Sequence, residues 1–157
     1  MSQVPEGRPV EETELLSRCR EAGLKATPQR LAIYRELWTR TDHPTPEDLF
    51  NAVRAAQPAL SLATVYKTLD TLVGAGLVHE VEHTGDKKRY DANVSPHHHL
   101  VCTRCGRIED FEDSKLSLAP KKSFTRGFIA ERVRVQVLGS CARCAKLQGG
   151  KRKRRES

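Results

Sequence analysis

The 157-residue sequence lacks any long apolar run, and no stretch approaches the roughly 18 consecutive apolar residues that a membrane-spanning helix needs. Residues 1–10 also lack the apolar core of a signal peptide. These absences argue against a membrane protein and against an exported protein. We therefore expect a soluble chain that works in the cytoplasm.

Aromatic residues are scarce as well. They make up 5% of the chain, hydrophobic residues make up 38%, and there is a single tryptophan. That composition is lean for one large hydrophobic core but sufficient for two small ones. We therefore expect two compact domains, one of which depends on a metal crosslink.

Acidic residues are too few to balance the basic ones, so the formal net charge is +7 and the isoelectric point is about 9.4. This excess favours a polyanionic partner, because Lys and Arg gain affinity by releasing counterions from phosphates. Part of it lies in residues 151–155, a basic run behind two glycines. We expect residues 148–157 to form a disordered tail and residues 1–9 a flexible N-terminus.

Helix signals recur along the first half of the chain. Helical spacing of apolar residues over residues 10–22, ended by Gly23, predicts a first helix in which Cys19 is a buried apolar residue and not a reactive thiol. N-cap signals follow at Thr27-Pro28, Thr45-Pro46 and Ser61. They predict three further helices, over residues 28–38, 46–56 and 62–73.

Residues 77–91 alternate between apolar and polar positions around a Thr-Gly-Asp turn, which predicts a β-hairpin. Helices followed by a basic hairpin are typical of a winged helix-turn-helix, so residues 10–90 are predicted to bind DNA. In that fold the last helix enters the major groove, and the hairpin, or wing, approaches phosphates. The polar, aromatic and basic residues expected at the DNA are Lys25, Gln29, Arg30, Ser61, Thr64, Tyr66, Lys67, Lys87, Lys88 and Arg89.

The second half has a different texture. Strand-like segments cover residues 99–104, 106–111 and 132–141, while residues 112–127 could hold a helix that Pro120 disfavours. A hinge at residues 91–95 is predicted to join the winged helix to this second domain, residues 96–147. The predicted fold class is α+β.

Two Cys-x-x-Cys pairs, Cys102 with Cys105 and Cys141 with Cys144, flank the second domain. Four thiolates are the set that a structural zinc ion takes in tetrahedral geometry. In a reducing cytosol this pattern favours metal ligation over a disulfide framework. A dithiol redox switch is the alternative. Zinc is the favoured interpretation because a small domain with few aromatic residues benefits from a crosslink.

Six segments together resemble the ferric uptake regulator family: GLKATPQRLAIYREL, HPTPEDLF, SLATVYKTLDTLVGAGLV, RYD, HHHLVCTRCGRIEDF and CARC. The resemblance covers about residues 10–147, in the family's order. It implies a homodimeric metalloregulator, not an enzyme, with an N-terminal winged helix and a C-terminal α/β dimerisation domain. Such a protein binds palindromic DNA operators when its regulatory metal is loaded.

The family's sensing site maps onto three histidines and two aspartates: His43, Asp91, His97, His99 and Asp110. Imidazoles and carboxylates suit a divalent ion such as Fe²⁺ or Mn²⁺. His98, between two of these ligands, is expected to face away because neighbouring residues of a strand alternate in direction. Its alternative role is that of a spare ligand.

Aspartate at Asp91 and Asp110, where iron-uptake repressors more often carry glutamate, resembles the peroxide-sensing repressors of the family. In those, bound Fe²⁺ reacts with hydrogen peroxide and a ligand histidine is oxidised, here His43 or His97 by position. An iron, manganese or nickel uptake repressor without peroxide chemistry is the first alternative. A zinc enzyme built on His97 and His99, and a zinc-stapled interaction module without sensing, are the others.

Overall fold

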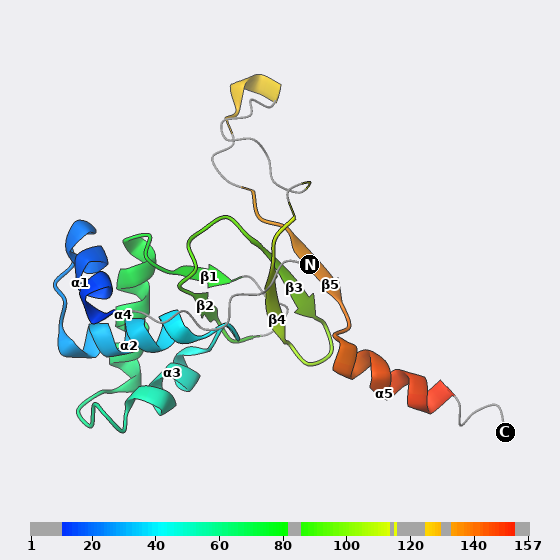
Figure 1. Cartoon of the computed structure of the whole chain (residues 1–157), viewed down its shortest axis with the longest axis horizontal. Coiled ribbons are helices and arrows are strands. Elements are labelled where there is room, and N and C mark those ends of the chain that lie inside the picture. The colour runs from blue at the N-terminus through cyan, green and yellow to red at the C-terminus, as the bar shows by residue number, and fades with distance from the viewer. Residues whose placement is uncertain (1–10, 82–85, 114, 116–124, 130–132, 153–157) are drawn as a thin grey trace. The chain divides into compact units, whose positions relative to one another are not determined.

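The computed structural model describes residues 11–81, 86–113, 115, 125–129 and 133–152, and of residues 148–152 it describes only the backbone. The chain divides into two compact units (Figure 1). We call the described residues up to Val94 the N-terminal unit and those from Ser95 the C-terminal unit. In this part of the chain, no helix is both long enough and apolar enough to cross a bilayer.

The N-terminal unit has the element order of a winged helix-turn-helix, as the sequence predicted. Helix α3 ends earlier than expected because the chain turns at residues 54–56. The two strands pair antiparallel, with Glu80 opposite Tyr90. The turn predicted between them falls mostly on residues 82–85, outside the described residues. The elements are α1 (Glu12–Glu21), α2 (Pro28–Thr39), α3 (Pro46–Val53), α4 (Leu62–Gly74), β1 (His79–Val81) and β2 (Arg89–Asp91).

Side-chain caps set where three of these helices begin. The hydroxyl oxygens of Thr27, Thr45 and Ser61 each accept a hydrogen bond from a backbone N–H in the first turn of the following helix. At α3 the cap is reciprocal, because the Asp48 carboxylate accepts the backbone N–H of Thr45 at 2.9 Å. Each cap satisfies an N–H group that has no partner within its helix. The predicted helix starts are confirmed.

The core of the N-terminal unit forms where the helices bury their apolar faces. Leu15, Ile33, Leu49 and Leu69 are fully buried in it. Cys19 is also fully buried, and mainly this burial raises the pKa of its thiol. The thiolate form is therefore disfavoured, and the prediction that Cys19 acts as a small apolar residue is confirmed.

The C-terminal unit is built on a three-stranded sheet in the order β4-β3-β5. Strand β3 pairs antiparallel with β4 and parallel with β5, so it is the central strand. All three lie within the segments predicted as strands. The helix considered for residues 112–127 falls largely outside the described residues, which include only a short turn, Thr125–Gly127. The strands are β3 (His98–Cys102), β4 (Ile108–Phe111) and β5 (Gln136–Gly139).

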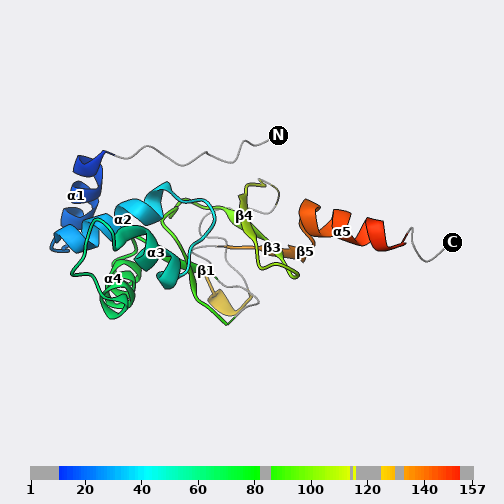
Figure 2. The same ribbon diagram turned by 90° about the horizontal axis from the view of Figure 1, so that it is seen from below.

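Helix α5 (Ala142–Arg152) follows β5 and was not predicted (Figure 2). The sequence analysis expected a disordered tail from residue 148, and this is wrong for residues 148–152, which continue the helix. Gly149 and Gly150 lower helix propensity, but adding residues to a helix costs far less than starting one. The turn from Cys141 starts α5, with the Ala145 N–H donating to the Cys141 carbonyl at 2.9 Å.

The end of α4 yields a matched pair of substitutions. Gly76 has a φ of +73°, and its N–H donates to the Val73 carbonyl at 3.0 Å, whereas Gly74 lies within the helix and has space for a methyl group. We expect Gly76→Ala to lower the free energy of unfolding by about 1–2 kcal/mol, because a Cβ is strained at positive φ. Gly74→Ala should raise it by about 0.5–1 kcal/mol.

Urea unfolding followed by the fluorescence of Trp38 measures both changes, since the single tryptophan packs against the core of the N-terminal unit. Equal effects of the two substitutions would contradict the assignment of Gly76 as the residue that ends α4.

Candidate metal centres and nucleic-acid interface

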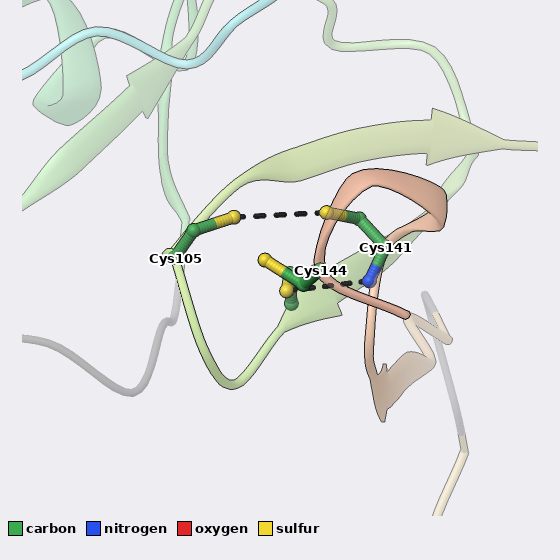
Figure 3. Close-up of side chains that lie close together, drawn as sticks. Cys105, Cys141 and Cys144 are labelled. Carbon is green, nitrogen blue, oxygen red and sulfur yellow. Dashed lines mark hydrogen bonds between the residues drawn. The ribbon is translucent and has the colours of Figure 1, made fainter. Parts of the chain in front are cut away.

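Four cysteines of the C-terminal unit converge on one point. Cys102 and Cys105 flank the turn from β3 to β4, and Cys141 and Cys144 lie at the start of α5 (Figure 3). Their sulfur atoms all lie within 4.8 Å of one another, and those of Cys105 and Cys141 are 3.7 Å apart. A tetrahedral zinc ion with Zn–S bonds of about 2.3 Å requires sulfurs about 3.8 Å apart. The four thiols therefore fit a structural zinc ion.

The electrostatics of this cluster also suit a divalent cation. Hydrogen bonds from backbone N–H groups lower the pKa of Cys102 to about 6, the first of them from Cys141, whose N–H lies 3.3 Å from the Cys102 sulfur. The Cys141 thiol, burial and the other neighbouring thiols raise the pKa of Cys144 to about 12. The site thus favours a first thiolate and resists a fourth. A bound cation would remove that resistance by neutralising the accumulated negative charge.

A second group of ligand atoms lies along β3 and β4. The Nε2 atoms of His97 and His99 are 3.0 Å apart, and an Asp110 carboxylate oxygen lies 3.6 and 3.5 Å from them. Two facts explain this convergence: the histidines are two residues apart along the chain, and His99 is paired with Asp110 across the strands. Two imidazoles and a carboxylate fit a borderline divalent ion such as Fe²⁺, Mn²⁺ or Zn²⁺.

The tautomer of His97 is fixed by its backbone neighbour. Its Nδ1 lies 2.7 Å from the carbonyl oxygen of Ser95, which can only accept, so Nδ1 carries the proton. The lone pair of the neutral ring is therefore on Nε2, which faces His99. This is the arrangement that metal-binding histidines commonly use, with one ring nitrogen oriented by a carbonyl and the other on the metal.

The remaining two predicted ligands belong to the N-terminal unit. His43 lies between α2 and α3, and Asp91 ends β2. Both side chains are buried, with His43 Nε2 3.7 Å from Asp91 Oδ2. The Asn93 N–H donates to Asp91 Oδ1 at 2.7 Å, which orients the other carboxylate oxygen toward His43. Within this unit the structure thus brings two of the five predicted ligands together.

His98 has a structural contact of its own. It is buried, its Nδ1 accepts a hydrogen bond from the Val135 N–H at 3.1 Å, and its ring lies 5.4 Å from that of Phe111. This bond occupies Nδ1 at the start of the pairing between β3 and β5. Of the two roles considered for His98, the structure favours the one in which it is not a ligand.

The residues predicted to contact DNA separate into two groups. Tyr66 and Lys67 are exposed on α4, as are Lys25 before α2 and Lys87 and Lys88 on the wing. Gln29 is half-buried. The other four are engaged within the protein: Ser61 and Thr64 form the α4 cap, Arg30 donates to the Lys25 carbonyl, and Arg89 donates to the His43 carbonyl.

The sequence analysis did not single out Glu47, on α3. Its carboxylate accepts the Tyr66 hydroxyl at 3.4 Å and lies 4.0 Å from Lys87 Nζ. Acidic residues are common in the first turn of a helix, so the sequence offered no further signal. Glu47 places a negative charge between the exposed face of α4 and the wing.

A winged helix followed by a sheet with a four-thiol centre and a nitrogen–oxygen ligand group defines a winged-helix protein with two kinds of metal centre. The chain matches the ferric uptake regulator family over residues 21–138. It belongs to that family.

Individual relatives agree with this assignment. The peroxide operon regulator of Bacillus subtilis (strain 168) is 34% identical over 136 residues, which is 86% of this chain and 94% of the relative. The solved peroxide stress regulator of Campylobacter jejuni is 31% identical with a TM-score of 0.62, over 84% of this chain and 97% of that one. The ferric uptake regulator from Pseudomonas aeruginosa with manganese is 28% identical with a TM-score of 0.67, over 81% and 97%.

Replacing one zinc ligand tests the four-thiol centre. We expect purified wild-type protein to hold about one zinc per chain that resists a mild chelator, and Cys144→Ser to lose it, because structural sites need all four ligands. Elemental analysis after dialysis measures the zinc. Cys19→Ala is the matched control, since Cys19 lies in the core of the N-terminal unit and should leave the zinc content unchanged. Equal zinc retention in both variants would contradict the assignment.

Substitution of His98 tests its structural role. His98→Ala leaves the Val135 N–H without its acceptor, a loss of about 1–3 kcal/mol when such a group stays buried. We expect faster hydrogen exchange at the Val135 amide in His98→Ala than in His98→Asn, because the asparagine oxygen can take the place of Nδ1. Mass spectrometry of the peptide containing Val135 measures the difference. Exchange at the wild-type rate in both variants would show that the bond is unimportant.

Proposed function

We propose that this chain is a metal-dependent, DNA-binding transcriptional repressor that senses peroxide. The observation that carries the proposal is the group of His97, His99 and Asp110, where two Nε2 atoms and a carboxylate oxygen converge in a unit that already has a separate four-thiol centre. Thiolates suit a permanent zinc ion, whereas nitrogen and oxygen ligands suit Fe²⁺ or Mn²⁺. One chain thus has the ligands for a structural metal and for a regulatory one.

The regulatory ion is proposed to take all five predicted ligands. His97, His99 and Asp110 come from the C-terminal unit, and His43 and Asp91 from the N-terminal unit. An ion held by both groups would join the two units through ligand bonds, so metal affinity and operator affinity would rise together. Bound Fe²⁺ would supply the reducing power that activates hydrogen peroxide.

The peroxide response is proposed to act through a ligand histidine. His43 or His97 would gain one oxygen atom from hydrogen peroxide, with water as the other product. Oxidation changes the imidazole that binds the metal, so the ligand set weakens and the protein releases its operator. The names of two relatives, the peroxide operon regulator and the peroxide stress regulator, support this branch of the family.

DNA binding is proposed to use α4 and the wing. Tyr66 and Lys67 are exposed on α4, and Lys87 and Lys88 are exposed on the wing. In a winged helix these elements meet the major groove and the flanking phosphates. Gln29 and Lys25 would approach the backbone from the start of α2.

A homodimer would present two α4 helices to a palindromic operator. The C-terminal unit exposes apolar side chains on β5 and α5, with Val137 45%, Leu138 55% and Leu147 68% accessible in the isolated chain. Such side chains on neighbouring elements are typical of a surface that a partner covers. A second copy of the chain is the proposed partner, and the family's regulators act on DNA, which argues against the zinc-enzyme alternative.

A metal-uptake repressor without peroxide chemistry is the second candidate. The likeness to the Pseudomonas aeruginosa ferric uptake regulator with manganese favours it, because the same ligand groups could report metal supply alone. A zinc-stapled interaction module would require that neither Mn²⁺ nor Fe²⁺ alters DNA affinity.

Operator binding by the full chain separates these candidates. The protein is loaded with Mn²⁺ or Fe²⁺ and exposed briefly to a low dose of hydrogen peroxide, and mass spectrometry follows the peptides that contain His43 and His97. We expect DNA binding to need either metal, and only the Fe²⁺ form to lose binding and gain one oxygen atom on a histidine. The Mn²⁺ form is the control for damage that is unrelated to iron.

Metal-dependent binding that survives peroxide in both forms would instead identify a metal-uptake repressor. The variant Asp110→Glu refines the test by keeping the charge and changing the reach of the carboxylate. An unchanged peroxide response of its Fe²⁺ form would show that this aspartate does not tune reactivity.

A further inference from the structure

His43 has an unusual backbone conformation for a proposed metal ligand. Its φ is +51°, in the left-handed region that residues other than glycine seldom adopt. Its side chain is 2% exposed and follows a surface turn in which Arg40 pairs with Asp42. Such a conformation persists only when the surrounding structure holds it.

Strand β2 supplies contacts that hold this loop. Arg89 Nη1 donates to the His43 carbonyl oxygen at 3.0 Å, and the next residue, Tyr90, donates its backbone N–H to the Pro44 carbonyl at 3.2 Å. The third residue of the strand is Asp91, whose Oδ2 lies 3.7 Å from His43 Nε2. Three consecutive residues of β2 therefore contact two consecutive residues of the loop.

Arg89 differs in this respect from the other basic residues of the wing. Lys87 and Lys88 are exposed, whereas Arg89 is half-buried and points one of its N–H groups inward. Its charge also acts on Asp48, the capping residue of α3. Burial opposes ionisation of Asp48, but hydrogen bonds from Thr45 together with the charges of Arg40 and Arg89 lower its pKa. Arg89 is thus surrounded by groups of its own unit.

We propose that Arg89 is a positioning residue for the regulatory metal: it holds His43 in the left-handed conformation that presents the imidazole beside Asp91. The inference rests on the proposed function, in which His43 and Asp91 bind the ion. It replaces the expectation that Arg89 grips a DNA phosphate. Arginine suits the task because its planar fork of several donors keeps a fixed direction, whereas lysine offers a flexible point charge.

The arrangement has a consequence for the wing. Arg89 and Asp91 lie on the same short strand, whose partner strand and connection form the wing. A metal that binds His43 and Asp91 would therefore tighten the contact between the loop and β2. Metal occupancy and the position of Lys87 and Lys88 become linked through this strand, which lies within one compact unit.

The test compares Arg89→Gln and Arg89→Lys with the matched charge-loss control Lys87→Gln. Calorimetric titration of the full chain with Mn²⁺, without DNA, gives the metal affinity. We expect Arg89→Gln to bind Mn²⁺ at least about tenfold more weakly than wild type, Arg89→Lys to be intermediate, and Lys87→Gln to be unchanged, because groups that orient a ligand commonly contribute 10- to 100-fold.

A second measurement separates positioning from phosphate contact. At saturating Mn²⁺, the slope of log affinity for operator DNA against log salt should be the same for Arg89→Lys, Arg89→Gln and wild type. A lost phosphate contact would instead make the slope shallower by about 0.9 in Arg89→Gln. Wild-type Mn²⁺ affinity in both variants, with a shallower slope in Arg89→Gln, would overturn the inference.

A third measurement needs no metal and guards against misfolding. In the metal-free protein, hydrogen exchange at the Tyr90 amide should be faster in Arg89→Gln than in Lys87→Gln, with Trp38 fluorescence unchanged in both. If Arg89→Gln fails to fold, Arg89→Lys decides the question by the same readouts. Unchanged exchange would overturn the positioning role. Failure of wild type to bind Mn²⁺ would instead overturn the proposed function, which the wild-type titration reports separately.

Discussion

The convergence of four thiols is the constraint on which the C-terminal unit depends. Among its described residues the buried apolar side chains are few, namely Val101, Cys102, Ile108 and Cys144, and two of these are themselves thiols. A sheet of three short strands with so small a core gains little from the hydrophobic effect. Its parallel partner β5 is distant in sequence, so the pairing must also overcome a long loop closure. A zinc ion held by the turn after β3 and the start of α5 opposes both costs, because it ties the two ends of the unit together.

Local signals account for what the sequence predicted about the fold. Thr27, Thr45 and Ser61 announce helix starts because their hydroxyls act within one turn, and the strand segments alternate over a few residues. The order β4-β3-β5 and the parallel pairing of β3 with β5 depend on contacts between distant segments, so no local pattern could provide them. Helix α5 was missed for the opposite reason. Its glycines and basic residues suggest disorder locally, while the preceding cysteine turn starts a helix.

The candidate site shows the same division. Spacing alone brought the four cysteines into one hypothesis, and strand alternation separated His98 from His97 and His99. The direction of a single long side chain is not encoded in that way. Arg89 has the composition of a phosphate contact, and only the structure reveals that its guanidinium turns inward to the His43 carbonyl. Glu47 had no signal beyond its place in the first turn of α3, although it contacts both Tyr66 and Lys87.

Strand β3 connects the two kinds of metal centre. It ends at Cys102, and three residues earlier it presents His99 opposite Asp110. The His99 N–H donates to the Val135 carbonyl at 3.0 Å, while the His98 ring accepts the Val135 N–H, so the ligand-bearing end of β3 is fixed to the segment that leads into β5. The other end is fixed by the thiols. A sheet held at both ends keeps the His97 and His99 lone pairs converging before any regulatory ion arrives, and a preorganised ligand set loses less conformational entropy on binding. The structural zinc and the regulatory site are therefore coupled through the register of a single strand.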